Sequence, residues 1–442
     1  MQVSRIVVLA SSSRMRSASI RGWGQKLGSS IVDQGILSGA NFLVSMLLAR
    51  WLTASEYGSF AVGFAGFLLL SGFHNALILE PMSVLGTAYR DYELPRYLWS
   101  LIWIQGALVI GLALVLGGIS VLAWSMGPHL GRSFGGLALA MPSILLYWFL
   151  RRVCYLVSRP QLAMRGGVIY AISLLTIFLA ISGGGRASSF VTFVSMGLAS
   201  SAAFAVIWRS LNEVFGSRPS FWKLSDVLGL LVKHWAYGRW VLGSTWVHWL
   251  SSSGYLPLVG SFAGLAQAGA LQALQNLLAP LQQTLTALGL VLLPWLAGQS
   301  INYGGRFVKD RTIPLALGLV SLAVLYALPL IAWGERLTEV LYQPGEYSRY
   351  AWLFPYLSAA SVLGAATQGL ALGLRAIGRP DAVFWSQAVA TLVMVSVGIQ
   401  LVRMLGLYGV VIGLVASSTA MVLTLLIYVS RGWFPSDEPA TS

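Results

Sequence analysis

The chain has 442 residues, of which 57% are hydrophobic and only 10% are charged, with a formal net charge of +14. Soluble domains carry about 25% charged residues, so this composition argues against a water-soluble enzyme and indicates that lipid covers most of the surface. The apolar runs are continuous rather than alternating, which argues against a transmembrane β-barrel.

The N-terminal segment, residues 1–28, is basic and rich in serine. Its apolar run Ile6–Ala10 is too short for a signal peptide, so we interpret the segment as a cytoplasmic tail. A membrane helix needs about 20 apolar residues, and the rest of the chain therefore predicts an all-α polytopic membrane protein with about twelve transmembrane helices. We expect them at residues 29–50, 58–80, 97–124, 134–151, 166–183, 188–208, 236–260, 266–297, 312–333, 351–374, 381–402 and 406–430. The eighth is long, and we expect it to bend at Pro280.

The Lys and Arg residues lie mainly in alternate connecting segments. If the N-terminus is cytoplasmic, 22 of the 28 Lys and Arg residues fall on the cytoplasmic side. The positive-inside rule then places both termini in the cytoplasm. This charge faces the anionic inner leaflet, so it predicts membrane lipids as partners and requires no nucleic acid.

The two halves of the chain resemble each other. Residues 50–58, which end in Glu56-Tyr57-Gly58, join the first two spans, and residues 261–269, which end in Gln267-Ala268-Gly269, join the seventh and eighth. Arg-Pro turns at 159–160 and 379–380 follow the fourth and tenth spans. An offset of six spans predicts two parallel six-helix lobes around a central cavity; chance likeness among apolar helices is the alternative. The predicted units are the tail 1–28, the N-lobe 29–208, a cytoplasmic linker 209–235, the C-lobe 236–430 and a cytoplasmic tail 431–442.

Polar residues recur at helical spacing inside four of these spans. Because polar groups within a membrane usually face an interior or an aqueous cavity, we expect these faces to line a substrate cavity between the lobes. The candidate residues are Gln34, Ser38 and Asn41 (with Ser45) in the first span, His74 and Asn75 in the second, Ser244 and His248 in the seventh, and Gln275 and Asn276 (with Gln272, Gln283 and Thr286) in the eighth. Hydrogen bonding between helices is the alternative for any single residue, and packing is the alternative for the two histidines.

Three charged residues inside the spans carry further hypotheses. Asp33 and Glu80 both lie in the cytoplasmic third of adjacent spans, and two neighbouring carboxylates can share a proton or a cation. We expect them to couple transport to H⁺ or Na⁺; a salt bridge to a basic residue such as Lys26 or Arg90 is the alternative. Arg239 lies one turn inside the seventh span, where its guanidinium suits an anionic headgroup, unless it only snorkels to lipid.

Several kinds of chemistry have no signature in the sequence. No GxxxxGK[ST] pattern is present, and no Cys/His cluster has the spacing of a metal site. The single cysteine, Cys154, cannot form an intrachain disulfide. The longest outer loop, about residues 332–349, is too short for a catalytic domain. We therefore expect no cofactor beyond a coupling ion, no metal site and no enzymatic activity.

The segment that crosses from the first span to the second resembles a known family. Leu47-Leu48-Ala49-Arg50-Trp51-Leu52 and Glu56-Tyr57-Gly58 are similar to the opening signature of bacterial polysaccharide exporters, flippases of lipid-linked oligosaccharides in the multidrug/oligosaccharidyl-lipid/polysaccharide (MOP) superfamily. The preceding run from Asp33 to Phe42 and the later Glu80-Pro81-Met82 resemble one branch of that family, the polysaccharide biosynthesis proteins.

The resemblance implies a function as well as a fold. It implies a flippase that moves a polyprenyl-diphosphate-linked oligosaccharide across the inner membrane by alternating access, for the synthesis of exopolysaccharide, capsule or O-antigen. Its partners would be the lipid-linked glycan and enzymes of polysaccharide assembly, and the working unit a monomer. A cation-coupled drug or small-solute antiporter, of the same superfamily or of the major-facilitator type, is the alternative function.

The expected topology can be tested with reporter fusions. Fusions at Gly184 and Gly345 should report a periplasmic location, and fusions at Gly216 and Ser442 a cytoplasmic one, because six spans in each lobe return the chain to the side where it started. A periplasmic location for the Ser442 fusion would require an odd number of spans and would contradict the parallel repeat.

Overall fold

The structure is a computed structural model that describes residues 20–86, 89, 93–182, 185–216, 224–342 and 345–430. Regular structure in these residues is entirely helical, which confirms the predicted all-α membrane fold. Most of the expected N-terminal tail (residues 1–19), part of the expected linker (217–223) and the tail 431–442 lie outside the described residues.

The first half of the chain forms one helical bundle, the N-lobe. Its elements are α2 (Ile20–Trp51), α3 (Ala54–His74), the π-helix η1 (Asn75–Leu79), α4 (Glu80–Leu85), α5 (Glu93–Trp124), α6 (Pro128–Leu156), α7 (Pro160–Ser182) and α8 (Ser189–Phe215). The helix α2 begins nine residues before the expected first span, so residues 20–28 of the expected tail are helical. The part of α2 that is apolar enough to cross a membrane is Val32–Trp51.

The second half forms the C-lobe. Its elements are α9 (Leu224–Ser252), α10 (Tyr255–Phe262), α11 (Leu265–Leu341), the 3₁₀-helix η3 (Ser348–Leu353), α12 (Phe354–Ala376), α13 (Pro380–Val393), the π-helix η4 (Met394–Gly398), α14 (Ile399–Leu405) and α15 (Leu407–Ser430). The element α11 contains the expected eighth and ninth spans as two arms, which meet at Gly304 with φ 81°. Pro280 keeps helical dihedral angles, so the break lies at Gly304 and not at Pro280.

Eleven helical segments of the described chain are long and apolar enough to cross a membrane. They coincide with every expected span except the seventh, 236–260. Those residues form the second half of α9 and most of α10, and the helix is interrupted between Ser252 and Tyr255. The turn contains Ser253 and Gly254, whose amides both donate to the carbonyl of Trp249.

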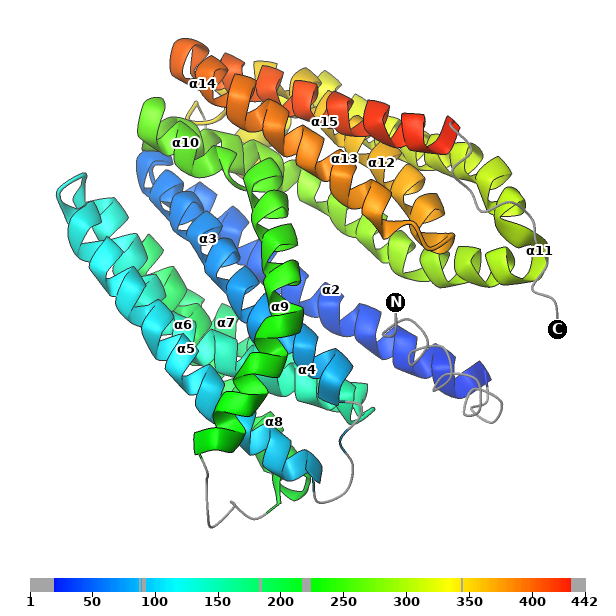
Figure 1. The fold of residues 1–442 in the computed structure, drawn as a ribbon. Coiled ribbons are helices and arrows are strands. Elements are labelled where there is room, and N and C mark those ends of the chain that lie inside the picture. The colour runs from blue at the N-terminus through cyan, green and yellow to red at the C-terminus, as the bar shows by residue number, and fades with distance from the viewer. Residues whose placement is uncertain are drawn as a thin grey trace.

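The two lobes meet at one end and diverge at the other (Figure 1). At the meeting point α3 crosses α11 so closely that a Cβ on Gly58 would overlap the carbonyl of Leu265, and one on Gly269 would overlap that of Ala54. These are the two glycines that the sequence repeat makes equivalent, and such small residues let membrane helices approach backbone to backbone. We call this end of the molecule the crossing end, and the opposite end, where α2 begins and α11 turns at Gly304, the open end.

The hydrophobic cores follow the same division. One core continues through both lobes and includes Leu48 and Tyr57 of the N-lobe together with Leu274 and Tyr347 of the C-lobe. Towards the open end the C-lobe has two cores of its own, one around Leu285 and Leu372, the other around Leu374 and Leu425. The lobes are therefore joined by apolar packing at the crossing end and are packed separately at the open end.

The glycine crossing predicts opposite effects for two alanine substitutions. Gly58→Ala places a methyl group against the Leu265 carbonyl and should destabilise the protein by about 1–3 kcal/mol, as overpacking does. Gly111→Ala, at an exposed position of α5 with no neighbouring atom within 4 Å, should leave stability unchanged or raise it through helix propensity. Thermal unfolding followed by tryptophan fluorescence in detergent measures both variants; an equal shift in the two would contradict the close crossing.

Candidate functional site

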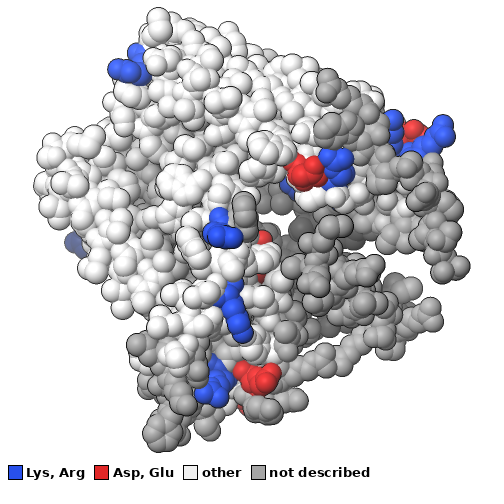
Figure 2. Space-filling model, in the orientation of Figure 1, with Lys and Arg blue, Asp and Glu red and all other residues white. Residues whose placement is uncertain are grey.

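A cavity of about 400 Å³ lies between α2 of the N-lobe and the first arm of α11 of the C-lobe. Most of its exposed lining is apolar, but five of its side chains are polar, and we call it the polar cavity after them. Figure 2 shows the surface hollowed between the two lobes, on the side away from the crossing end. The lining residues are Gln34, Gly35, Ser38, Gly39 and Phe42 from α2, and Ala279, Pro280, Gln283, Thr284, Thr286 and Ala287 from α11. The polar stripes that the sequence predicted on the first and eighth spans therefore face each other across this cavity.

The cavity lining carries no formal charge. Its polar groups are amides and hydroxyls, and the Gln34 side chain lies 3.5 Å from the hydroxyl of Ser38. Gln34, Gln283 and Thr286 are all exposed to the cavity. Amides and hydroxyls both donate and accept hydrogen bonds, so these groups can bind hydroxyl groups of a ligand such as a sugar, while the larger, apolar part of the lining can pack against its carbon skeleton.

Asp33 lies one residue from the cavity wall and points into the N-lobe instead. Its side chain is fully buried, and its Oδ2 accepts hydrogen bonds from Nη2 of Arg151 at 2.6 Å, from Nε of Arg151 at 3.1 Å and from the hydroxyl of Tyr155 at 2.5 Å. The other oxygen, Oδ1, is buried and has no hydrogen-bond partner among the described side chains. The acid is thus paired with Arg151 of α6; the side chains of Lys26 and Arg90, which the sequence hypothesis named, lie outside what the structure describes.

Glu80 has a separate environment. Its Oε1 accepts a hydrogen bond of 3.3 Å from the hydroxyl of Tyr237 on α9, and Arg152 lies within electrostatic reach. Arg152 donates in turn to Oδ1 of Asn75 at 3.3 Å. The two acids therefore have different basic partners: Arg151 forms an ion pair with Asp33, and Arg152 lies near Glu80.

The other predicted site residues of α2 and α11 lie closer to the crossing end. Asn276 is buried, and its Nδ2 donates to the hydroxyls of Ser45 at 3.0 Å and Tyr57 at 2.7 Å. Asn41 accepts a hydrogen bond of 2.8 Å from Tyr170 of α7. These contacts join helix to helix. The predicted stripes therefore line the cavity only at the part nearer the open end. We call Ser45, Tyr57 and Asn276 the polar seal.

The remaining predicted residues are scattered. His74 is fully buried inside the N-lobe, as the last residue of α3 before η1 begins. Gln275 is half-buried on α11, and Arg239 and Ser244 are exposed on α9. His248 belongs to α9, but its side chain lies outside what the structure describes.

The helix α9 contacts both lobes. Near its start, Nδ1 of His234 lies 3.1 Å from the carbonyl of Leu77 in η1, and Nε2 lies 3.0 Å from the hydroxyl of Tyr97. A π-helix shifts the backbone hydrogen bonding by one residue and often marks a functional site; here a side chain of α9 meets a carbonyl of that turn. Near its other end, the carbonyl of Val247 accepts from Thr391 of α13, at 3.0 Å. The sequence analysis missed His234, Tyr97 and the Arg151–Arg152 pair.

On the face drawn in Figure 2, most of the charged side chains lie towards the open end. In Figure 2 the basic and acidic atoms lie mostly along the lower and right-hand parts of the molecule, where α4 and α9 and the turns of α11 and α13 are found in Figure 1, and most of the remaining described surface is uncharged. This distribution is what the positive-inside rule predicts if the open end faces the cytoplasm.

Comparison with solved structures shows a shared fold. The lipid II flippase MurJ, in an inward-closed conformation, superposes with a TM-score of 0.68 at 15% identity, over 93% of this chain and 88% of that one. A eukaryotic MATE transporter gives 0.67 at 15% identity, over 93% and 96% of the two chains. An inward-facing multidrug-resistance MATE transporter of the MOP superfamily gives 0.65 at 14% identity, over 91% and 98%. No family model and no curated protein matches the sequence.

At such identities the likeness establishes the fold alone. The chain has the two-lobed fold of MOP-superfamily transporters, and the structures it resembles are transporters and a flippase rather than enzymes. The fold that the sequence-based resemblance implies is thereby confirmed, and flippase and drug antiporter are equally compatible with that fold.

The cavity predicts which introduced cysteines react with water-soluble reagents. In a Cys154→Ser background, cysteines at Ser38 and Gln283 should react rapidly with a charged methanethiosulfonate, because both positions line the cavity. A cysteine at Leu43, which is exposed on α2 outside the cavity, should face lipid and react slowly. Mass spectrometry of the labelled protein measures the rates; equal rates at Ser38 and Leu43 would remove the case for an aqueous cavity.

Proposed function

We propose that the protein is a flippase that translocates a polyprenyl-diphosphate-linked oligosaccharide from the inner to the outer leaflet of a bacterial inner membrane, for surface polysaccharide synthesis. The observation that supports the proposal is the uncharged cavity between the two lobes, whose wall carries amides and hydroxyls among apolar residues, at the end of the molecule where the lobes diverge. A glycan offers many hydroxyl groups to such a lining, and the cavity lies where a lipid-linked substrate of the cytoplasmic leaflet would enter.

The transport cycle would be alternating access by a monomer. In the conformation described, the crossing end is closed by the glycine contact and by the polar seal, while the cavity lies towards the open end. Substrate would enter from the cytoplasmic side, and separation of the lobes at the crossing end would release it outside. Enzymes of polysaccharide assembly would supply the substrate and consume it.

Arg239 would hold the diphosphate at the cytoplasmic mouth. It is exposed on α9, two residues after Tyr237, which contacts Glu80. A guanidinium binds phosphate oxygens through two parallel hydrogen bonds, whereas the lining of the polar cavity supplies no cation. The diphosphate would therefore bind at the charged mouth, and the glycan would lie in the uncharged cavity.

Asp33 and Glu80 would couple transport to a proton or sodium gradient. The guanidinium of Arg151 donates two hydrogen bonds to Oδ2 of Asp33. Neutralisation of Asp33 by a bound cation would weaken this ion pair and release Arg151. The unpaired Oδ1 leaves one acceptor position open in the buried site. A cation bound more tightly in one lobe arrangement than in the other would shift the equilibrium between them.

A cation-coupled drug or small-solute antiporter is the second candidate. The observation that favours it is the buried acid of α2, because an exchanger needs an ion site inside the lobes, and two of the similar structures reported above are MATE transporters. Reconstitution into proteoliposomes separates the candidates: a flippase moves a fluorescent polyprenyl-diphosphate disaccharide between leaflets, and an antiporter exchanges a cationic dye for the ion instead.

Arg239 substitutions test the headgroup contact. Arg239→Lys keeps the charge but loses the forked geometry, so disaccharide translocation should fall partly, and Arg239→Ala should lower it further. The matched control is Arg209→Ala, another exposed arginine, on α8. Translocation at the wild-type rate by Arg239→Ala, at equal protein level, would assign this residue to lipid snorkelling.

Asp33→Asn tests the coupling site. The variant mimics a neutralised acid, so translocation should persist without a gradient and lose its acceleration by an imposed one. Removing one partner of a buried ion pair can cost about 3–5 kcal/mol, so Asp33→Asn combined with Arg151→Met serves as a second, charge-balanced variant. Asp381→Asn, which breaks the exposed pair with Arg379, is the control. If an imposed gradient accelerates translocation in both Asp33 variants as it does in the wild type, the Asp33–Arg151 pair has only a structural role.

A further inference from the structure

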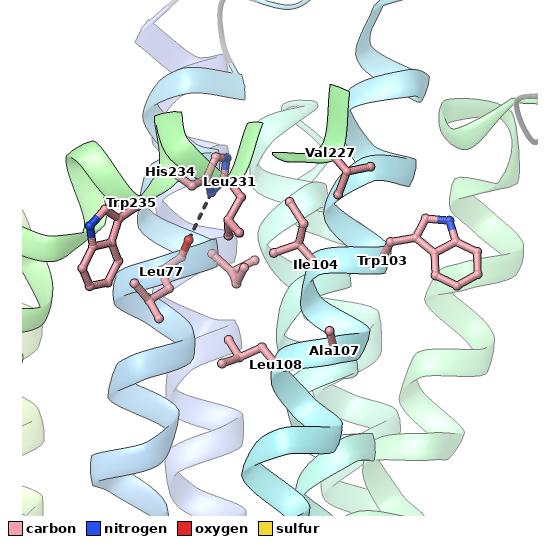
Figure 3. Close-up of a pocket in the computed structure, with 10 residues that line it drawn as sticks. Leu77, Trp103, Ile104, Ala107, Leu108, Val227, Leu231, His234 and Trp235 are labelled. Atoms are coloured by element: carbon pink, nitrogen blue, oxygen red, sulfur yellow. Dashed lines mark hydrogen bonds between the residues drawn. The ribbon is translucent and has the colours of Figure 1, made fainter. Parts of the chain in front are cut away.

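A second cavity, separate from the one between the lobes, opens between α5, η1 and α9. It is a groove of about 370 Å³ whose exposed lining is almost entirely apolar. Figure 3 shows its walls: Ile104, Ala107 and Leu108 come from α5, Leu231 and Trp235 from α9, and Leu77 from η1. We call it the α5–α9 groove.

The one titratable side chain in the groove is already engaged. His234 places Nδ1 3.1 Å from the carbonyl of Leu77 and Nε2 3.0 Å from the hydroxyl of Tyr97. A ligand of the groove would therefore meet methyl, methylene and aromatic groups, and hydrocarbon is the chemistry that fits them.

The groove lies at the depth of lipid chains. Trp103 is ten residues from the start of α5 and Leu231 is seven residues from the start of α9, which places them about 15 and 10 Å from the open end at 1.5 Å per residue. The hydrocarbon layer of one leaflet, half of the bilayer core, is about 15 Å thick. Trp103 and Trp235, at opposite sides of the groove in Figure 3, are both about half exposed, as expected for tryptophans near a membrane interface.

Basic side chains lie between the groove and the open end. Lys233 is exposed and directly precedes His234 on α9, and Arg96 is exposed on α5, seven residues before Trp103 and thus on nearly the same helix face. Among the described side chains at this rim, one acid, Glu93, lies about a turn closer to the start of α5. Long basic side chains reach from the hydrocarbon to the headgroup level, so this rim favours an anionic headgroup over a zwitterionic one.

We propose that the α5–α9 groove binds an acyl chain of an anionic phospholipid of the cytoplasmic leaflet, with its phosphate held by Lys233 and Arg96. The chain fills the gap between α9 and the N-lobe and so stabilises the position in which His234 contacts η1. The site is independent of the transported substrate, because its residues are distinct from those of the polar cavity.

Photolabelling tests the site on the unmodified protein. The wild-type chain is placed in nanodiscs that contain phosphatidylglycerol with a diazirine in its acyl chain, and labelled peptides are identified by mass spectrometry. Labelling should concentrate on residues 103–108 and 227–235. The stretch from Ile110 to Leu122 of the same helix, whose exposed apolar residues face lipid, is the internal control. Even labelling along α5, or equal labelling by the matching phosphatidylethanolamine, would overturn the proposal.

Three variants separate the acyl chain from the headgroup. Ala107→Trp fills the groove and should abolish the preference for residues 227–235, whereas Leu114→Trp, seven residues further along α5 and also exposed, should not. Lys233→Gln should lower the preference for phosphatidylglycerol by about fivefold, which corresponds to about 1 kcal/mol per basic residue near an anionic surface. Wild-type labelling in Ala107→Trp, or an unchanged lipid preference in Lys233→Gln, would contradict the assignment.

Discussion

The contact between Gly58 and Gly269 is the constraint on which the rest of the structure depends. Inside a membrane, lipid chains are as apolar as leucine, so helices associate through close packing and hydrogen bonds rather than through the hydrophobic effect. A backbone-to-backbone crossing of α3 and α11 fixes the lobes at a single place. Because the two glycines are equivalent in the sequence repeat, the crossing lies where a two-fold axis would relate the lobes. Towards the open end the C-lobe has cores of its own, and the cavity lies between Gln34 and Ser38 of one stripe and Gln283 and Thr286 of the other.

Sequence reasoning was strongest where the signal is local to one helix. The polar stripe with Gln34 and Ser38 follows helical spacing, and so does the stripe with Gln283 and Thr286. In the structure these four residues lie on opposite walls of one cavity. The break in the seventh span had a local signal that was overlooked, since three serines precede Gly254 where the helix ends. Helix periodicity therefore predicts which face is polar, provided that the helix continues.

The partner of Asp33 could not be predicted in the same way. The fourth span was expected to end at residue 151, which placed Arg151 and Arg152 in a cytoplasmic segment; in the structure α6 continues to Leu156 and carries both into the N-lobe. An arginine with a buried acid as partner does not need to leave the membrane. The π-turn at Asn75–Leu79 also escaped prediction, because one extra residue in a helical turn has no signature in composition.

The α11 face that carries Gly269 links the crossing to the cavity. Gly269, Asn276 and Gln283 are spaced by seven residues, about 10.5 Å along the helix and nearly on one face. The first lies in the crossing, the second in the polar seal and the third in the cavity wall. Opening the lobes at the crossing end would expose Asn276, Ser45 and Tyr57 to water, which can replace their hydrogen bonds. Each such exchange costs about 0.5–1.5 kcal/mol, so a seal of neutral polar groups keeps the two arrangements within the few kcal/mol that a ligand or a bound cation can supply. A seal of buried ion pairs, or of tightly packed aromatic rings alone, would hold one arrangement too strongly for a transport cycle.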